Sequence, residues 1–90
     1  MDESASYTKK QGQYLAYIHT YTLLHNRPPA ELDMQRFFGT TPPSVHRMVV
    51  ELHRKGLISR TPGAPRSIKL TVDANELPRL EEPSNRSSSL

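Results

Sequence analysis

The chain has 90 residues, enough for one small domain, and it carries 12 Lys and Arg, 9 Asp and Glu and a net charge of +3. It contains no cysteine, which excludes disulfides and cysteine-ligated zinc sites and suits a reducing compartment. No apolar run approaches the roughly 18 residues that a membrane span needs. The polar start MDESASYTKK also lacks the apolar core of a signal peptide, so we expect a small cytoplasmic protein.

The basic charge is concentrated in the part of the chain that is expected to fold. Residues 1–72 carry ten Lys and Arg against five Asp and Glu, whereas residues 73–90 carry two against four. A basic excess on a folded domain favours a polyanionic partner. A merely solvated basic surface would have the same composition, so charge alone leaves both interpretations open.

Two helices are predicted in the first half of the chain. Thr8 is a suitable N-cap for a helix over residues 9–26, and the prolines of Arg27-Pro28-Pro29 end it, because a residue before proline avoids the α region. A shorter helix is expected over residues 30–38, with Gly39 as its C-terminal cap. The expected apolar sides are Tyr14, Tyr17, Ile18, Tyr21 and Leu24 in the first helix and Met34, Phe37 and Phe38 in the second.

A third helix is predicted over residues 42–55, with Thr41 as N-cap, Pro42 at the first position and Gly56 at its end. Glu51 and Lys55 have the spacing and polarity of an ion pair across one turn. The expected buried face consists of Val45, Met48, Val49 and Leu52. The opposite face consists of Pro43, Arg47, Val50 and Arg54, with Ser44 and His46 on its flanks. This exposed face is cationic and free of acids near the start of the helix.

Beyond Gly56 the apolar period changes to that of strands. Residues 57–60 and 67–72 are predicted as short strands, the second with clear alternation. The connection contains Pro62-Gly63, a pair typical of a type II turn. We therefore expect a hairpin with a basic tip.

Two helices joined by a short turn and followed directly by a hairpin have the order of a winged helix-turn-helix. The expected fold class is mainly α with a small β-hairpin, that is, three helices plus a wing. This domain should cover residues 8–72. We expect a disordered N-terminus over residues 1–7 and an acidic, then Ser/Pro-rich, flexible tail over residues 73–90, which has too little apolar content to fold alone.

Five segments are informative in combination: HNRPPA, DMQRFFG, TPPSVHRMVVEL, RKGLISR and PGAPRSIKL. Through these segments the sequence over roughly residues 8–72 also resembles the winged-helix DNA-binding domain of LexA-type repressors. The resemblance implies a sequence-specific regulator of transcription, usually a repressor, that binds DNA as a dimer. The turn before the third helix is about one residue shorter than is usual in the family. The family's self-cleaving protease domain has no counterpart in this sequence, so no damage-triggered self-cleavage is implied.

These arguments predict that helix 42–55 reads the major groove of double-stranded DNA and that wing 61–67 contacts the backbone. By the resemblance, Thr41, Ser44, His46 and Arg47 fall where the family's base-reading residues cluster. The full set of expected DNA-binding residues is Thr40, Thr41, Ser44, His46, Arg47, Val50, Arg54, Arg60 and Arg66. Because one helix reads few base pairs, we expect a homodimer on a pseudo-palindromic site. Such a protein would be associated with the nucleoid.

Other functions have weaker support. His46 and His53 are seven residues apart on one helix, too far to share an ion directly, so we expect no metal and no other cofactor. No nucleophile–base pair has usable spacing and no glycine-rich phosphate loop is present, so we expect no enzyme. The alternative is a winged-helix module that binds protein without specific DNA binding, since the fold does not determine function. RNA binding stays open but lacks paired aromatics on a strand face.

Overall fold

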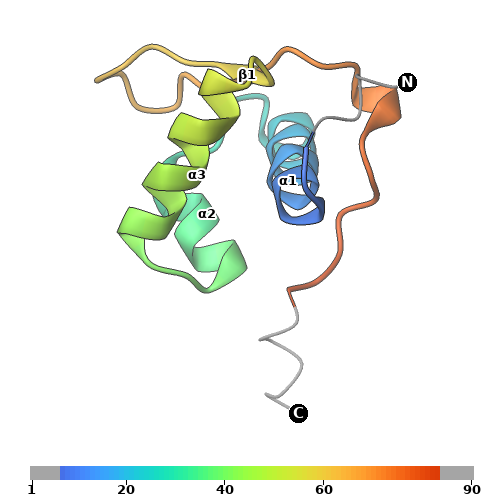
Figure 1. Cartoon of the computed structure of the whole chain (residues 1–90), viewed down its shortest axis with the longest axis horizontal. Coiled ribbons are helices and arrows are strands. Elements are labelled where there is room, and N and C mark those ends of the chain that lie inside the picture. The colour runs from blue at the N-terminus through green and yellow to red at the C-terminus, as the bar shows by residue number, and fades with distance from the viewer. Residues whose placement is uncertain (1–6, 84–90) are drawn as a thin grey trace.

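The computed structural model describes residues 7–83. The elements follow the order α1 (Lys9–His25), α2 (Glu31–Phe38), α3 (Pro42–Arg54), β1 (Ile58–Ser59), β2 (Lys69–Leu70) and a short 3-10 helix (Ala74–Glu76) (Figure 1). The predicted winged helix-turn-helix, with three helices and a two-stranded wing, is confirmed. No helix within the described part of the chain has the length and apolar character to cross a membrane.

Local capping signals determine where α1 begins and ends. The Thr8 hydroxyl accepts a hydrogen bond from the backbone N–H of Gln11, and the Gln11 side chain accepts one from the backbone N–H of Thr8, both at 3.0 Å. This reciprocal pair is a capping box. Asn26 ends the helix in the left-handed conformation, with φ of 58°. The predicted N-cap is therefore confirmed, and the helix ends at His25, one residue before the predicted boundary.

The turn between α2 and α3 also follows the prediction. Gly39 closes α2 with φ of 62°, a conformation that costs glycine little. Thr41 then caps α3 by accepting a hydrogen bond from the backbone N–H of Ser44 at 3.3 Å, and Pro42 occupies the first helical position. The helix ends at Arg54, with Lys55 as its C-cap rather than its last residue.

The wing is an antiparallel hairpin whose strands are shorter than predicted. Ile58 pairs with Leu70 and Ser59 pairs with Lys69. Beyond these two pairs the strands are joined by the side chain of Ser67. Its hydroxyl accepts a hydrogen bond from the backbone N–H of Thr61 at 2.9 Å and donates one to the carbonyl of Thr61 at 3.2 Å. Side-chain bonding thus replaces the ladder where Arg66 adopts a φ of 58°.

The tip of the wing contains the expected tight turn. The backbone N–H of Ala64 donates to the carbonyl of Thr61 at 3.0 Å, and Gly63 has a φ of 82°. A positive φ at the third residue of a four-residue turn, with proline at the second, is the geometry of a type II turn. In Figure 1 this loop projects beside α3, at the upper left.

One core lies between the three helices and the wing. Its fully buried members include Tyr14, Leu15, Ile18, Met34, Val45, Val49, Leu52, Leu57, Ile58 and Ile68. Phe37 and Phe38 are half-buried and stack on tyrosines of α1 at centroid distances of 4.7 Å and 4.1 Å. The predicted buried face of α3 is confirmed, with Met48 at its edge.

The prediction that Leu24 belongs to the buried stripe of α1 is wrong, because its side chain is 71% exposed. The neighbouring Leu23 is 70% exposed, and residues 22–27 are all exposed. Within residues 7–83 no other element covers the last turn of α1, so the apolar spacing of the helix continues beyond the part that packs in the core. Leu15, which the stripe omitted, is fully buried instead.

Residues 73–83 lie beside α1, although their composition predicts a flexible tail (Figure 1). The Gln13 amide donates to the carbonyl of Arg79 at 2.9 Å, and its oxygen accepts from the backbone N–H of Glu81 at 2.8 Å. Gly12 makes this approach feasible, since a Cβ there would lie 3.1 Å from Pro78. Residues 84–90 of the predicted tail and residues 1–6 of the predicted disordered N-terminus lie outside the described residues.

Candidate nucleic-acid interface

The side of α3 that faces away from the core is a polar, basic surface. Pro43, His46, Arg47 and Val50 are exposed, whereas Val45, Val49 and Leu52 on the opposite side are fully buried. Because three apolar residues fix the rotation of the helix, the exposed side chains have defined directions from a rigid element. A surface of this kind can enter a groove of matching width.

The start of α3 is held by its own hydroxyl groups. Besides capping the backbone N–H of Ser44, the Thr41 hydroxyl donates to the Ser44 hydroxyl at 3.0 Å. Thr40 lies one residue earlier, and its backbone N–H donates to the carbonyl of Gln35 at 3.2 Å, which closes α2. These bonds order the turn while leaving the two hydroxyls exposed or half-exposed.

Arg47 is the cation on this surface that is available to a ligand. Within residues 7–83 its guanidinium makes no ion pair or side-chain hydrogen bond. It lies beside Lys10 of α1, Ser44 and Glu51 around a shallow cavity of about 360 Å³. Lys10 was absent from the predicted set, because nothing local in the sequence indicates that the start of α1 reaches α3.

His46 has an acidic neighbour on α2. Its Nδ1 lies 3.3 Å from a carboxylate oxygen of Glu31, and its side chain is 59% exposed. Glu31 therefore faces the flank of α3. A ligand that contacts His46 must share it with this carboxylate.

The side chain of Arg66 turns back onto the helices. Its Nη1 donates to the Tyr21 hydroxyl and to the Pro28 carbonyl, both at 3.1 Å, and lies 3.1 Å from a carboxylate oxygen of Asp33. Burial alone would raise the pKa of Asp33, but the backbone N–H of Ala30 and the Arg66 guanidinium outweigh burial and lower that pKa. Arg66 thus connects the wing to α1 and α2.

Two comparisons with known proteins bear on this surface. The model of the LexA DNA binding domain family matches residues 4–67, which include all three helices and most of the wing. This chain belongs to the LexA DNA-binding domain family.

The chain is similar to LexA repressors of several bacteria. It is 36% identical to that of Thermosipho melanesiensis over 63 residues, which cover 70% of this chain and 32% of the relative. It is 32% identical to that of Thermotoga neapolitana over 76 residues, which cover 83% of this chain and 39% of the relative. The chain therefore spans between about a third and two fifths of the length of these relatives.

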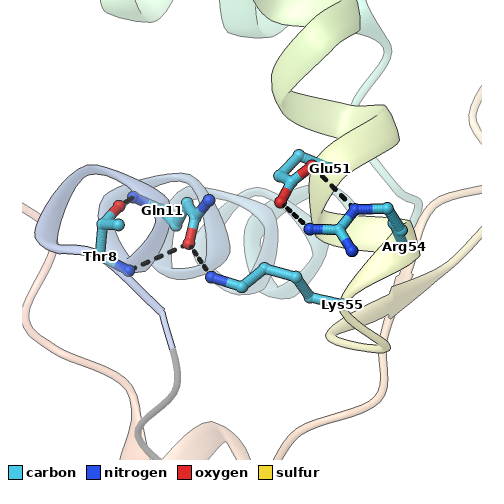
Figure 2. Close-up of polar contacts among 5 residues, drawn as sticks. All are labelled: Thr8, Gln11, Glu51, Arg54 and Lys55. Carbon is cyan, nitrogen blue, oxygen red and sulfur yellow. Dashed lines mark hydrogen bonds and ion pairs between the residues drawn. The ribbon is translucent and has the colours of Figure 1, made fainter.

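In this LexA DNA-binding domain, the far end of α3 carries an ion pair that differs from the predicted one. Glu51 pairs with Arg54 through two hydrogen bonds, and Lys55 instead donates to the side chain of Gln11 at 2.8 Å (Figure 2). The hydrogen bond from Arg54 lowers the pKa of Glu51. The charge of Arg54 is thus partly satisfied within α3, unlike that of Arg47.

The predicted DNA-binding residues of the LexA domain therefore fall into groups. Thr40, Thr41, Ser44, His46, Arg47 and Val50 share one continuous side of the turn and α3, Arg54 lies at the far end of the helix, and Arg60 and Arg66 belong to the wing. No group of three or more potential metal-binding side chains occurs within residues 7–83. That any of these residues contacts DNA stays a prediction.

Proposed function

We propose that this LexA DNA-binding domain binds double-stranded DNA in a sequence-specific manner and regulates transcription as a repressor. In this proposal the exposed side of α3 enters the major groove and the wing lies over the adjacent backbone. The observation that carries it is Arg47, which has no side-chain partner among residues 7–83 and lies on the exposed side of a helix whose other side is fully buried. Such a helix presents one cation to base edges in a fixed direction.

The remaining residues take supporting roles. Thr41 and Ser44 would contact bases or phosphates at the start of α3, and Val50 would contact a thymine methyl group. Arg54 would meet the backbone at the far end of the helix. Because Arg66 already has three oxygen partners, we assign it to holding the wing rather than to binding phosphate. Two copies on a pseudo-palindromic site would supply the length of sequence that one helix cannot read.

The first test is a comparison of Arg47→Ala with the parent on selected and scrambled duplexes, the preferred site having been selected from a random DNA pool. A bidentate contact between arginine and guanine contributes about 1–3 kcal/mol of discrimination. Arg47→Ala should therefore weaken binding to the selected site roughly 5- to 150-fold and change binding to scrambled DNA much less. Binding is measured by fluorescence anisotropy across a salt series.

Arg36→Ala is the matched control, since Arg36 is an exposed cation on α2 and its loss removes the same charge. This variant should retain the preference for the selected site. Equal weakening of both duplexes by Arg47→Ala would show that α3 does not read sequence. If the parent selects no DNA at all, the protein-binding alternative replaces this proposal.

A further inference from the structure

A cavity of about 600 Å³ lies between the start of α1, the turn that joins α2 to α3, and the last described residues of the chain. Lys9 and Lys10 border it from α1, Thr40 borders it from the turn, and residues 81–83 form its remaining side. Lys10 also borders the separate cavity beside Arg47. Charges in the first cavity therefore act next to the surface that we assign to DNA.

The last described residues are held at this cavity through their backbone. The Gln13 amide group donates to the carbonyl of Arg79 at 2.9 Å, and its oxygen accepts from the backbone N–H of Glu81 at 2.8 Å. Because both partners are main-chain groups, the path of the chain is fixed without any contribution from the side chain of Glu81. Leu77, which precedes this stretch, packs against the core. We call residues 79–83 the strap.

The strap brings two acidic groups to a basic cavity. Glu81 and Glu82 are exposed and border the cavity together with Lys9 and Lys10. Among residues 7–83 none of these four side chains forms an ion pair, so opposite charges share the cavity without being joined. They still act on one another, because screening is incomplete within about 8 Å at physiological ionic strength. A phosphate that approaches Lys10 therefore also meets the field of two carboxylates.

We propose that the strap is an autoinhibitory element that weakens the binding of DNA. This inference rests on the proposed function and adds a means of regulation to it. While the strap is docked, Glu81 and Glu82 oppose the approach of backbone phosphates to Lys9 and Lys10. When the strap leaves α1, the two lysines become fully available. Coupling of this kind is reciprocal, so bound DNA in turn loosens the strap.

The first test is the double variant Glu81→Gln/Glu82→Gln, which keeps the backbone contacts of the strap with Gln13. Its affinity for the selected duplex should rise roughly threefold to tenfold at low salt, as expected for the loss of two exposed charge interactions. The gain should shrink as salt is added, because exposed charges are screened. Fluorescence anisotropy across a salt series measures both effects, and melting curves show that each variant is folded.

The controls separate the position of the acids from their effect on net charge. In a Lys9→Gln/Lys10→Gln background, the two changes in the strap should give little gain, because the acids act through these lysines. Glu76→Gln removes one acid from the neighbouring 3-10 helix, beside a cavity that Lys10 and Thr40 do not border. It should raise affinity less than Glu81→Gln alone.

Hydrogen exchange followed by NMR tests the reciprocal effect. The backbone N–H of Glu81 is bonded to Gln13 in the docked strap. Saturation of the parent with the selected duplex should accelerate exchange of this amide, whereas the amide of Ile18 in the buried part of α1 should stay protected. Gln13→Ala removes both backbone contacts and should accelerate exchange at Glu81 before any DNA is added.

The strap assignment is overturned if Glu81→Gln/Glu82→Gln binds DNA no more tightly than the parent at low salt. It is also overturned if the gain is equally large in the Lys9→Gln/Lys10→Gln background, since the acids would then act through net charge alone. Unchanged exchange at Glu81 on DNA binding has the same meaning. In these cases the parent still selects DNA and the proposed function stands. If neither the parent nor the strap variant binds any duplex, the proposed function falls and takes this inference with it.

Discussion

Leu52 lies on the buried face of α3 and is fully excluded from solvent. Replacing a fully buried leucine by alanine leaves a cavity as well as removing apolar contacts. We expect Leu52→Ala to lower the free energy of unfolding by roughly 2–5 kcal/mol, a large part of the stability of a small domain. Urea unfolding followed by circular dichroism gives the value directly.

Val50 offers the control for this prediction, because it lies on the same helix and is 40% exposed. Val50→Ala should change the free energy of unfolding by no more than about 0.5 kcal/mol. If Leu52→Ala were as stable as the parent, Leu52 would not lie in the core. The rotation of α3 about its axis would then be different, and the side chains assigned to DNA would not form its exposed side.

At the scale of elements, the conformation of the wing depends on Arg66. A non-glycine residue with φ of 58° carries conformational strain, and such strain persists where the surroundings determine the conformation. The contacts of Arg66 with Tyr21 and Asp33 meet that condition. The wing is therefore held by a side chain at its base as well as by its two short strands.

We expect Arg66→Ala to loosen the wing without unfolding the helices. Backbone amides of residues 61–67 should exchange faster with solvent, whereas those of α1 and α3 should not. The pKa of Asp33, which Arg66 helps to lower, should rise, as measured by NMR titration. Lys69→Ala, which removes an exposed charge from β2, is the control and should change neither quantity.

The salt dependence of DNA binding also tests the role of Arg66. If Arg66 holds the wing and does not contact phosphate, the slope for Arg66→Ala should fall by clearly less than one. A fall of a full unit in the slope for Arg66→Ala would show that Arg66 contacts phosphate, as the sequence predicted.

At the scale of the whole molecule, residues 73–83 contribute to the fold. Leu77 packs against the core, and Gln13 binds the backbone on both sides of Leu80. Deletion of residues 73–90 should lower stability by about 1–2 kcal/mol, since a leucine is only partly buried there. Tm should fall by roughly 4–8 °C for each kcal/mol in a domain of this size.

Deletion of residues 84–90 alone should leave Tm unchanged, because this polar, serine-rich segment has a single apolar residue and can bury little apolar area. Gln13→Ala tests the same contacts with the full chain present and should reproduce part of the loss. Equal Tm values for all three proteins and the parent would show that the segment contributes nothing to stability. Differential scanning calorimetry is the measurement.

The features that were predictable from the sequence are those with local signals. Thr8, Thr41 and Gly39 mark helix ends through bonds to residues a turn away, and the three-residue and four-residue spacing of α3 defines its buried face. The exposed residues around Arg47 could be predicted from the same spacing, because they lie opposite the buried face. Helix ends and buried faces depend on residues that are close in the chain, so they can be predicted from the sequence.

The features that were missed depend on contacts between distant residues. Gln13 meets residues 79 and 81, and Arg66 meets Tyr21, 45 residues earlier. Composition made residues 73–83 resemble a flexible tail, since polar and proline-rich segments cannot bury themselves. A basic wing tip likewise gave no sign that its arginine would turn inward. The position of Lys10 beside α3 could be found only after the elements had been placed.

The capping box of α1 has a third member. The oxygen of Gln11 that accepts from the backbone N–H of Thr8 also accepts from the ammonium group of Lys55, the C-cap of α3 (Figure 2). A capping box forms locally, but this acceptor is shared with a partner 44 residues away. The consequence is a link between two helix ends that are remote in the chain: loss of the ammonium group of Lys55 would remove a contact at the start of α1 as well as at the end of α3.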